Sequence, residues 1–423
     1  MEGQQGGGDG AVEDVARDIE RFQLSGEGGY QPQRGSASDA PHAAPPTGVE
    51  LQRRIFTHNK PHSSGGLQWV DEVELKKQRS VAVDVLKQLG QNILEGKDLT
   101  KIALPVYLFE PRSFLERLAD GFSFAPHFLR KAAEAKDALE RLKYVIAFSV
   151  AGLHLTATQK KPFNPILGMP GLPIPMDCYR VINDNDNNNN NTGETHQAFF
   201  EDGTAVYCEQ SSHHPPASNF QVLPPDDAYR LYGFGIFSAH WKGNVIHGLQ
   251  KGPNLVEFPA DGTIISIELP HAIFKGLIWG DRIQDYGGSI TFTDKKNDLA
   301  CELTFEAPGW VASWFSTPKH PSDWLSDVLA KVEGSWLSHV DVDGKRYWDL
   351  KEVAPWSIRP ADNPLPSDCR YREDLQALLR GDEEEAQRLK VKLEEKQRRE
   401  ARLRDEGEAA ARAKRSRGDK GAK

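Results

Sequence analysis

The middle of the chain consists of short β segments that follow one another closely. Between about residues 198 and 359, segments rich in aromatic and β-branched residues recur, among them AVYCEQ, YRLYGFGIFSAHW, TIISIELP and LACELTFEA. Such residues favour strands, and the DG, GG, KKND and PG sequences between them favour turns. Because no helical pattern intervenes, neighbouring strands are expected to pair in antiparallel fashion. The region therefore predicts an antiparallel barrel or sandwich.

Helical patterns flank this β region. SVAVDVLKQLGQNIL places Val85, Leu89 and Ile93 on one face of a helix, as the helical period requires. Residues 124–158 have apolar residues at three- and four-residue spacing and predict two helices. Residues 382–413 predict a long charged helix with few apolar positions. That helix can pack on the rest of the molecule only along a narrow stripe.

The two ends of the chain differ in composition from the middle. Residues 1–48 are rich in small and polar residues and are expected to be disordered, whereas residues 49–79 have no clear assignment. The formal net charge is −9, yet residues 370–423 hold 17 Lys and Arg against 13 Asp and Glu. We expect the basic end to be a solvated tail, and we keep open weak attraction to anionic membranes and nuclear targeting.

Composition also disfavours several classes of protein. The balance of 52 Lys and Arg against 61 Asp and Glu disfavours generic nucleic-acid binding. No apolar run is long enough for a membrane-spanning helix, and the first residues do not resemble a secretory signal. The four cysteines lack CxxC spacing, which indicates reduced thiols of a cytosolic protein, at Cys178, Cys208, Cys301 and Cys369.

The most unusual string is EQSSHHPP, in which His213 and His214 precede two prolines. Proline restricts the residue before it, so this loop is suited to presenting imidazoles in fixed directions. A zinc site would need two more ligands, which no nearby Cys or His supplies. An acid–base site would need a nucleophile and an orienting group. An anion site would combine the imidazoles with Lys or Arg around a phosphate. Ordinary loop histidines remain the simplest alternative.

Two further strings carry groups suited to an anion. KKPFNPILG places Lys161 and Asn164 on a rigid loop. In the long charged helix, Lys390, Glu394 and Arg398 follow one another at intervals of four and share one face. Taken alone, the first string is typical of a solvated turn and the second of an intrahelical salt-bridge ladder.

Together these strings resemble the oxysterol-binding-protein-related family. EQSSHHPP closely resembles the EQVSHHPP signature of the family, and KKPFNPILG resembles its KKPxNPxxGE segment. KDLTKIALPVYLFEPRSFLERLAD is similar to the stretch after the family's lid, and LKVKLEEKQRR to its C-terminal LEExQR helix. The motifs occur in the family's order and cover about residues 80–405. Met169 replaces the usual acidic residue and Ser211 the usual hydrophobic one, which leaves the mouth geometry and the second ligand open.

The resemblance implies a mainly β, α+β fold. Its centre is an incomplete antiparallel β-barrel that encloses a lipid tunnel, with an N-terminal lid, flanking helices and a C-terminal helix. On this basis residues 1–79 form a disordered or transitional region and residues 80–405 the lipid-binding domain, with the lid at about 80–103. Residues 406–423 are then a basic disordered tail.

The implied function is lipid binding and transfer between membranes without enzymatic chemistry, cofactor or metal. Phosphatidylinositol 4-phosphate would be exchanged for a sterol by a cytoplasmic protein that touches anionic membranes peripherally and binds no nucleic acid. The alternatives are an exchanger of phosphatidylserine for phosphatidylinositol 4-phosphate, a lipid sensor without net transfer, and a histidine-dependent hydrolase.

Matching the motifs residue by residue assigns a headgroup site and a lid. The headgroup contacts implied by the resemblance are Lys161, Asn164, His213, His214, Lys390, Glu394 and Arg398. The apolar stripe of Val85, Leu89 and Ile93 would close the mouth over the ligand and would touch membrane when open.

Overall fold

The structure is a computed structural model of the whole chain. The residues it describes are 47–63, 65–89, 103–167, 193–213, 215–306, 310–316 and 328–418. The predictions made for residues 1–46, for Ile93 and for His214 lie outside this described part.

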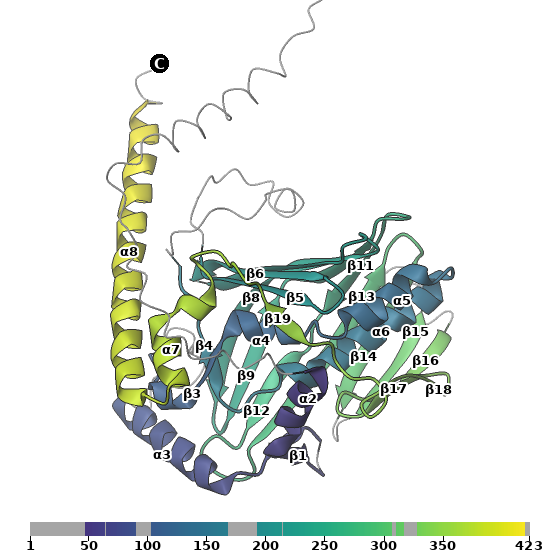
Figure 1. Cartoon of the computed structure of the whole chain (residues 1–423), viewed down its shortest axis with the longest axis horizontal. Coiled ribbons are helices and arrows are strands. Elements are labelled where there is room, and N and C mark those ends of the chain that lie inside the picture. The colour runs from purple at the N-terminus through teal and green to yellow at the C-terminus, as the bar shows by residue number, and fades with distance from the viewer. Residues whose placement is uncertain are drawn as a thin grey trace, which may run out of the picture. The chain divides into compact units, whose positions relative to one another are not determined.

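One large antiparallel sheet dominates the described residues (Figure 1). Its strands are β1 (Asn59–Pro61), β2 (Leu67–Trp69), β5 (Thr195–Phe200), β6 (Ala205–His213), β7 (Pro216–Leu223), β8 (Arg230–Lys242), β9 (Val245–Lys251), β10 (Asn254–Phe258), β11 (Thr263–Glu268), β12 (His271–Lys275), β13 (Ile283–Asp294), β14 (Leu299–Glu306), β15 (Trp310–Ser316), β16 (Val328–Ser335), β17 (His339–Val342), β18 (Lys345–Asp349) and β19 (Ile358–Pro360).

Most neighbours in this sheet are joined by short turns, and a few pairings between non-consecutive strands curve it. β8 pairs with both β9 and β10, and β13 pairs with β11, β12, β14 and β2. At the other end of the β region, β19 returns to β5, with Ile358 opposite Phe200. The result is a near-closed ring of antiparallel strands, which confirms the predicted fold class.

The helices lie before and after the strands in the chain. They are α2 (Gly48–Thr57), α3 (Glu72–Leu89), α4 (Phe114–Asp120), α5 (Ala125–Glu134), α6 (Ala138–Leu153), α7 (Glu373–Leu379) and α8 (Glu383–Gly418), with the 3-10 turns η3 (Val106–Leu108), η4 (His154–Thr156) and η6 (Cys369–Tyr371). A separate parallel pair joins β3 (Phe109–Ser113) to β4 (Lys161–Phe163). The two helices predicted for residues 124–158 are α5 and α6.

Two element boundaries differ from the sequence expectations. The domain boundary expected at residue 80 falls inside α3, and β2 before it pairs with β13 through Gln68 and Ile283. At the other end, α8 continues to Gly418, past the boundary expected at residue 405. β1 and β2, which come from the region expected to be disordered or transitional, are thus strands of the large sheet.

The main core lies between α4, α5, α6 and one face of the sheet. α6 is buried along most of its length, and Trp336, Trp348 and Phe124 are fully buried beside it. Full burial of a large apolar side chain contributes about 1.5–3 kcal/mol. His154 stacks on Trp348 with ring centroids 5.7 Å apart, and burial lowers the pKa of His154 to about 3. Its imidazole is therefore neutral and acts as a core side chain.

A second, smaller core attaches α8 to the body. It joins η3, β3, β4, α7 and the first turns of α8, and its buried residues are Val106, Phe109, Phe163, Leu375, Ala377, Ala386 and Leu389. Further along, α8 exposes Leu403. The beginning of this charged helix is therefore fixed by apolar contacts, as its single narrow apolar stripe predicts.

One part of the sheet is only partly covered on both of its faces. The inner face of the ring is marked by Phe237, whose ring centroid lies 4.6 Å from that of Phe114 on α4. In β10, buried and half-buried residues alternate, as expected for a sheet covered on one face. In β9 and β12 the alternation is lost, and residues on both faces are half-exposed, with Lys251 exposed. Inner-face side chains here, such as Ile246 and Phe274, are therefore only partly buried.

Candidate functional site

Three elements that are far apart in the sequence bring two ammonium groups to one aromatic ring. Lys161 begins β4, Lys390 lies on α8 and Phe109 begins β3. The Nζ atoms of Lys161 and Lys390 lie 5.0 and 5.1 Å from the centroid of the Phe109 ring. Cation–π attraction explains why two like charges approach the same ring. We call the following residues the Phe109 cluster: Phe109, Lys161, Asn164, Lys390 and Glu394.

Hydrogen bonds fix the polar members of this cluster. Lys161 Nζ donates to Asn164 Oδ1, and Lys390 Nζ donates to Glu394 Oε1. Arg398 donates to the second oxygen of Glu394 at 3.3 Å, although its own side chain is 63% exposed. Lys390 is buried. The salt-bridge ladder predicted for α8 is therefore present, and its buried end faces Lys161.

The electrostatics of the cluster favour an incoming anion. Burial, together with repulsion from Lys390 and Arg372, lowers the pKa of Lys161 to about 7, and attraction to Glu394 only partly opposes this. A negative charge placed between the two lysines would restore the charged form of Lys161. It would also receive charge-assisted hydrogen bonds, which are the stronger kind. The arrangement is therefore suited to a phosphate group.

The sequence did not reveal Arg372, whose side chain supports the loop that carries Asn164. Arg372 donates to the carbonyl oxygen of Asn164 at 2.6 Å and to Glu194 at 2.9 Å. It also pairs with Asp374 at 2.8 Å, and its guanidinium lies 5.0 Å from the Phe163 ring centroid. The arginine and both carboxylates are buried. Because Asn164 and Glu194 are distant from Arg372 in sequence, no local motif marks Arg372 as part of the site.

Glu194 also joins the two sequence motifs. Its backbone N–H donates to Ile166 of KKPFNPILG at 2.7 Å, and its carbonyl accepts from Gln210 of EQSSHHPP at 2.9 Å. Its carboxylate accepts from the backbone N–H of Ile166 at 3.2 Å and from the Ser113 hydroxyl. The two motifs are therefore neighbours in the fold.

A second missed contact ties α3 to the strand of the cluster. Lys160 Nζ lies 2.7 Å from Glu74 Oε1 on α3, and the Tyr107 hydroxyl donates to Glu74 Oε2 at 2.8 Å. Burial opposes ionisation of Glu74, but hydrogen bonds from Lys160, Tyr107 and Gln78 lower its pKa overall. The carboxylate is thus held ionised beside η3 and β4.

The predicted lid helix borders the cluster. Val85 is buried, although it comes from the stripe predicted to close the mouth. It lines a cleft of about 310 Å³ that two members of the cluster also line. The lining residues are Val85, Ala103, Leu104, Pro105, Gln387, Lys390, Val391 and Glu394. The end of α3 therefore lies against the same edge of α8 as the predicted headgroup residues.

The remaining predicted residues are only partly described. His213 ends β6 and pairs with Pro216 across the turn to β7, but its side chain is outside the described part, as is the whole of His214. Leu89 ends α3 without a described side chain. Their assignment to the headgroup and the lid stays a prediction.

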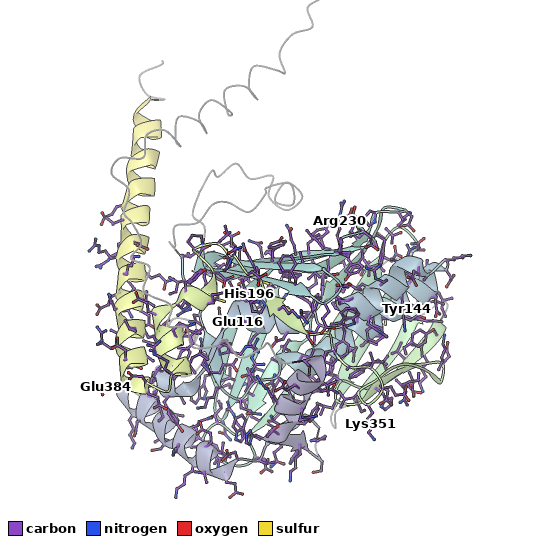
Figure 2. The ribbon with its side chains drawn as sticks, in the orientation of Figure 1. Glu116, Tyr144, His196, Arg230, Lys351 and Glu384 are labelled. Carbon is purple, nitrogen blue, oxygen red and sulfur yellow. The ribbon has the colours of Figure 1, made fainter. Side chains whose placement is uncertain are left out.

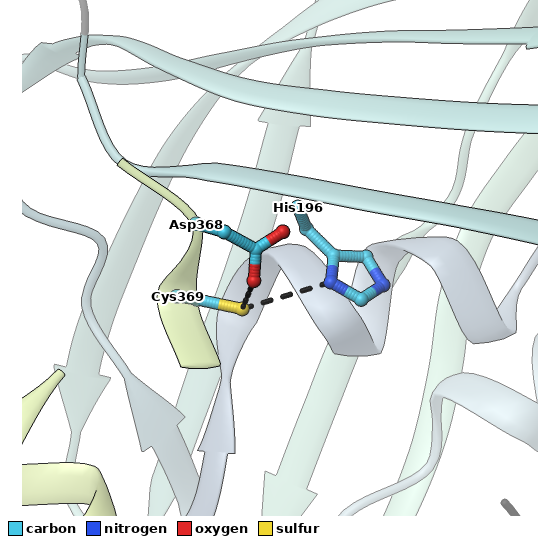
Figure 3. A group of neighbouring side chains, drawn as sticks. All are labelled: His196, Asp368 and Cys369. Carbon is cyan, nitrogen blue, oxygen red and sulfur yellow. Dashed lines mark hydrogen bonds between the residues drawn. The ribbon is translucent and has the colours of Figure 1, made fainter. Parts of the chain in front are cut away.

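One group of buried side chains offers ligands of the kind that metals use, His196, Asp368 and Cys369 (Figure 3). Cys369 Sγ lies 3.6 Å from His196 Nδ1 and 3.8 Å from Asp368 Oδ1. Burial and nearby carboxylates raise the pKa of Cys369 well above its usual value, so it is a neutral thiol. Asp368 already accepts hydrogen bonds from Arg370 and from the backbone N–H of Gln197. The group therefore joins η6 to β5 as a hydrogen-bonded contact.

Two solved domains share this fold. The Osh1 ORD domain in complex with cholesterol matches with a TM-score of 0.60 and 22% identity, over 79% of this chain and 89% of that one. The Osh3 ORD in complex with PI(4)P from Saccharomyces cerevisiae matches with a TM-score of 0.56 and 23% identity, over 76% of this chain and 84% of that one. The ring of strands with helices at both ends is thus the fold of these ORD domains.

Sequence comparison then shows the family. The model described as oxysterol-binding protein matches residues 84–354 and 351–416. Oxysterol-binding protein 9 of Dictyostelium discoideum is 41% identical over 383 residues, which cover 85% of this chain and 83% of the relative. Human oxysterol-binding protein-related protein 5 is 28% identical over 79% of this chain, which spans only 37% of that relative.

The chain belongs to the oxysterol-binding protein family and contains its lipid-binding ORD domain. Proteins of this family bind and transfer lipids without catalysing a reaction, which confirms the prediction that the chain is not an enzyme. Among the described residues, no helix combines the length and the apolar character needed to cross a membrane.

Proposed function

We propose that this chain binds phosphatidylinositol 4-phosphate with its headgroup at the Phe109 cluster and transfers it between membranes in exchange for a sterol. The observation that carries the proposal is the meeting of Lys161 and Lys390 over the Phe109 ring, with their Nζ atoms 5.0 and 5.1 Å from its centroid. The Osh3 domain, which shares the fold, was solved with PI(4)P. The Osh1 domain was solved with cholesterol.

Each member of the cluster has a chemical role in this proposal. The 4-phosphate receives charge-assisted hydrogen bonds from Lys161 and Lys390. The side-chain oxygens of Asn164 and Glu394 accept hydrogen bonds from the inositol hydroxyls. Arg398, from its exposed position, contacts a phosphate group. The resemblance adds His213 and His214 as imidazole donors from the turn after β6.

The acyl chains and the sterol would lie along the inner face of β8, β9 and β12. Phe237, Ile246 and Phe274 alternate onto this face, and all three are half-exposed there. Burial of each CH₂ group of a lipid against such a surface contributes about 0.8 kcal/mol. Partly exposed apolar side chains inside a ring of strands are the feature that a lipid tunnel requires.

The proposal places the chain in the cytoplasm, in transient contact with anionic membranes. Phosphatidylserine is the alternative second lipid, and lipid sensing without net transfer is the alternative use of the same site. Mass spectrometry of lipids that co-purify with the full chain distinguishes a sterol from phosphatidylserine as the second lipid, because either would be found directly. A donor-to-acceptor liposome assay separates transfer from sensing.

The histidine assignment has its own test. The variant His213→Ala/His214→Ala is expected to extract less phosphatidylinositol 4-phosphate from liposomes than wild type and to load sterol normally. Extraction at the wild-type level would remove both histidines from the proposed site. Equal losses of both lipids would indicate misfolding, which circular dichroism of the variant would show independently.

A further inference from the structure

The outer face of β8, β9 and β12 carries an unusual set of side chains. The strand register places His240 directly opposite His247, and His247 opposite Ile273, so these residues share one face. Phe237 and Trp241 alternate with them onto the inner face. The residues of the outer face that carry or can gain positive charge are His240, Lys242, His247, Lys251, His271 and Lys275. We call these six residues the histidine–lysine face.

This face is accessible and has a positive balance. None of β8, β9 and β12 contains Asp or Glu. Lys242 is exposed, and the side chain of Lys275 is 39% exposed while it lies 3.6 Å from Asp285 of the adjacent strand. Burial, followed by repulsion from His271, Lys242 and His240, lowers the pKa of His247. The positive groups are thus close enough to influence one another.

An exposed tryptophan extends from the same edge of the sheet. Trp279 lies in the turn between β12 and β13 and is 61% exposed. The turn is held in place, since the Asn244 side chain donates to Trp279 O at 2.7 Å and accepts from the Ile278 N–H at 2.8 Å. Asn244 belongs to the β8–β9 turn that also carries Lys242. The backbone at Trp279 is therefore fixed next to the turn that follows Lys242.

The edge of the sheet that carries Trp279 lies next to α3, the helix that borders the Phe109 cluster. Arg79 of α3 donates to the carbonyl oxygen of Gly280, the residue after Trp279. The same helix contacts β4 through Glu74 and Lys160. A surface bound to this edge would therefore lie next to the helix that borders the Phe109 cluster.

We propose that Trp279 and the histidine–lysine face form the surface by which this chain docks on an anionic membrane. The inference rests on the proposed lipid transfer, which requires the site to approach a bilayer. Tryptophan is enriched where one side of its ring is apolar and the other is wet, as at a bilayer interface. Each basic side chain near an anionic bilayer strengthens binding by about fivefold. An apolar anchor with basic neighbours and no acidic residue on the three strands fits that partner.

The test is co-flotation of the full chain with vesicles of phosphatidylcholine, with or without about a fifth of phosphatidylserine. Wild type is expected to float with the anionic vesicles and to bind neutral ones at least several-fold less. Trp279→Ser and Lys242→Glu are each expected to lower anionic binding about fivefold or more. Two changes elsewhere serve as matched controls and are expected to bind as wild type: Tyr371→Ser, at an aromatic residue that is 53% exposed, and Lys351→Glu, at an exposed lysine.

A second measurement separates docking from lipid recognition. Loading of water-soluble, short-chain phosphatidylinositol 4-phosphate needs no bilayer, so Trp279→Ser is expected to load it as wild type does. If wild type itself does not load the short-chain lipid, the proposed function is overturned, whereas the docking result is unaffected. The docking proposal is overturned if wild type ignores anionic vesicles, if it binds neutral ones equally, or if the controls lose as much as the two test variants. A protein partner for this edge would then be the alternative.

Discussion

At the scale of single residues, the central feature is a lysine whose pKa lies near neutral pH. Burial and the nearby cations Lys390 and Arg372 lower the pKa of Lys161 to about 7. In the unfolded chain the same lysine titrates near its ordinary value of about 10.4. Protonation of the folded protein at Lys161 is therefore unfavourable between these two values, and an anionic ligand must supply the compensating charge.

The lowered pKa of Lys161 predicts how the affinity for the lipid changes with pH. Above pH 7, Lys161 must take up a proton when the phosphate binds, so affinity for short-chain phosphatidylinositol 4-phosphate should fall by up to tenfold per pH unit as pH rises from 7.5 to 9. The phosphate is already fully ionised in this range. Lys161→Arg keeps its charge and should show a flatter profile by isothermal titration calorimetry. Parallel profiles for the two proteins would contradict the assignment of Lys161.

Arg372 is expected to matter for stability, because it pairs with two buried carboxylates, Glu194 and Asp374. Arg372→Ala leaves both charges uncompensated and should lower the free energy of unfolding by about 3–5 kcal/mol. Urea denaturation measures this. Arg370→Ala is the neighbouring control, since Arg370 is more exposed and forms its ion pair with one buried carboxylate, Asp368, rather than with two. A loss no greater than that of the control would show that the buried network is not required.

The site residues that sequence reasoning found all belong to local strings. Lys161 and Asn164 are three positions apart, and Lys390 and Glu394 are one helical turn apart, so their spacing is visible in the chain. Arg372 and Glu194 are 178 positions apart, and only the fold brings them together. The same is true of Glu74 and Lys160.

At the scale of elements, Glu74 joins α3 to η3 and to the residue before β4. Glu74 accepts from Lys160, Tyr107 and Gln78, and the helix has its buried Val85 at the cleft beside α8. Glu74→Gln removes the charge that Lys160 pairs with. We expect faster amide hydrogen exchange across residues 72–89 and faster lipid release. Glu72→Gln, an exposed change on the same helix, is the control, and equal exchange in the two variants would contradict the role of Glu74.

The sequence predicted most strands and helices, and its failures have a simple cause. Strands of seven or more residues, such as β8 and β13, show their composition and turns clearly. β1 and β2 have three residues each, NKP and LQW, too few to show an alternation. Their pairing with the rest of the sheet depends on tertiary contacts, so no sequence pattern marks these two strands.

At the scale of the whole molecule, the account requires a ring of strands whose inside is not filled by side chains. Gly248 lies on the inner face of β9, opposite Ala239 and Ala272, and a Cβ there would meet its nearest atom at 3.7 Å. Gly248→Trp should therefore fold with an almost unchanged melting temperature and lose co-purifying lipid. Leu249→Trp, on the outer face, should keep its lipid.

A packed interior would give the opposite result for Gly248→Trp. Overpacking of a filled core typically costs 1–3 kcal/mol or more, so the variant would melt several degrees lower. A clear loss of stability in Gly248→Trp, with Leu249→Trp unaffected, would argue against the tunnel. Figure 2 draws the side chains of the described residues on the ribbon of Figure 1.

The most direct measurement is extraction of phosphatidylinositol 4-phosphate from liposomes by wild type and by Lys161→Ala/Lys390→Ala, with sterol extraction measured in parallel. Hydrogen bonds to charged groups contribute about 1.5–3 kcal/mol each. The double variant should therefore lose at least about a hundredfold in phosphoinositide affinity and extract sterol as wild type does. Phosphoinositide extraction at the wild-type level by the double variant would contradict the account.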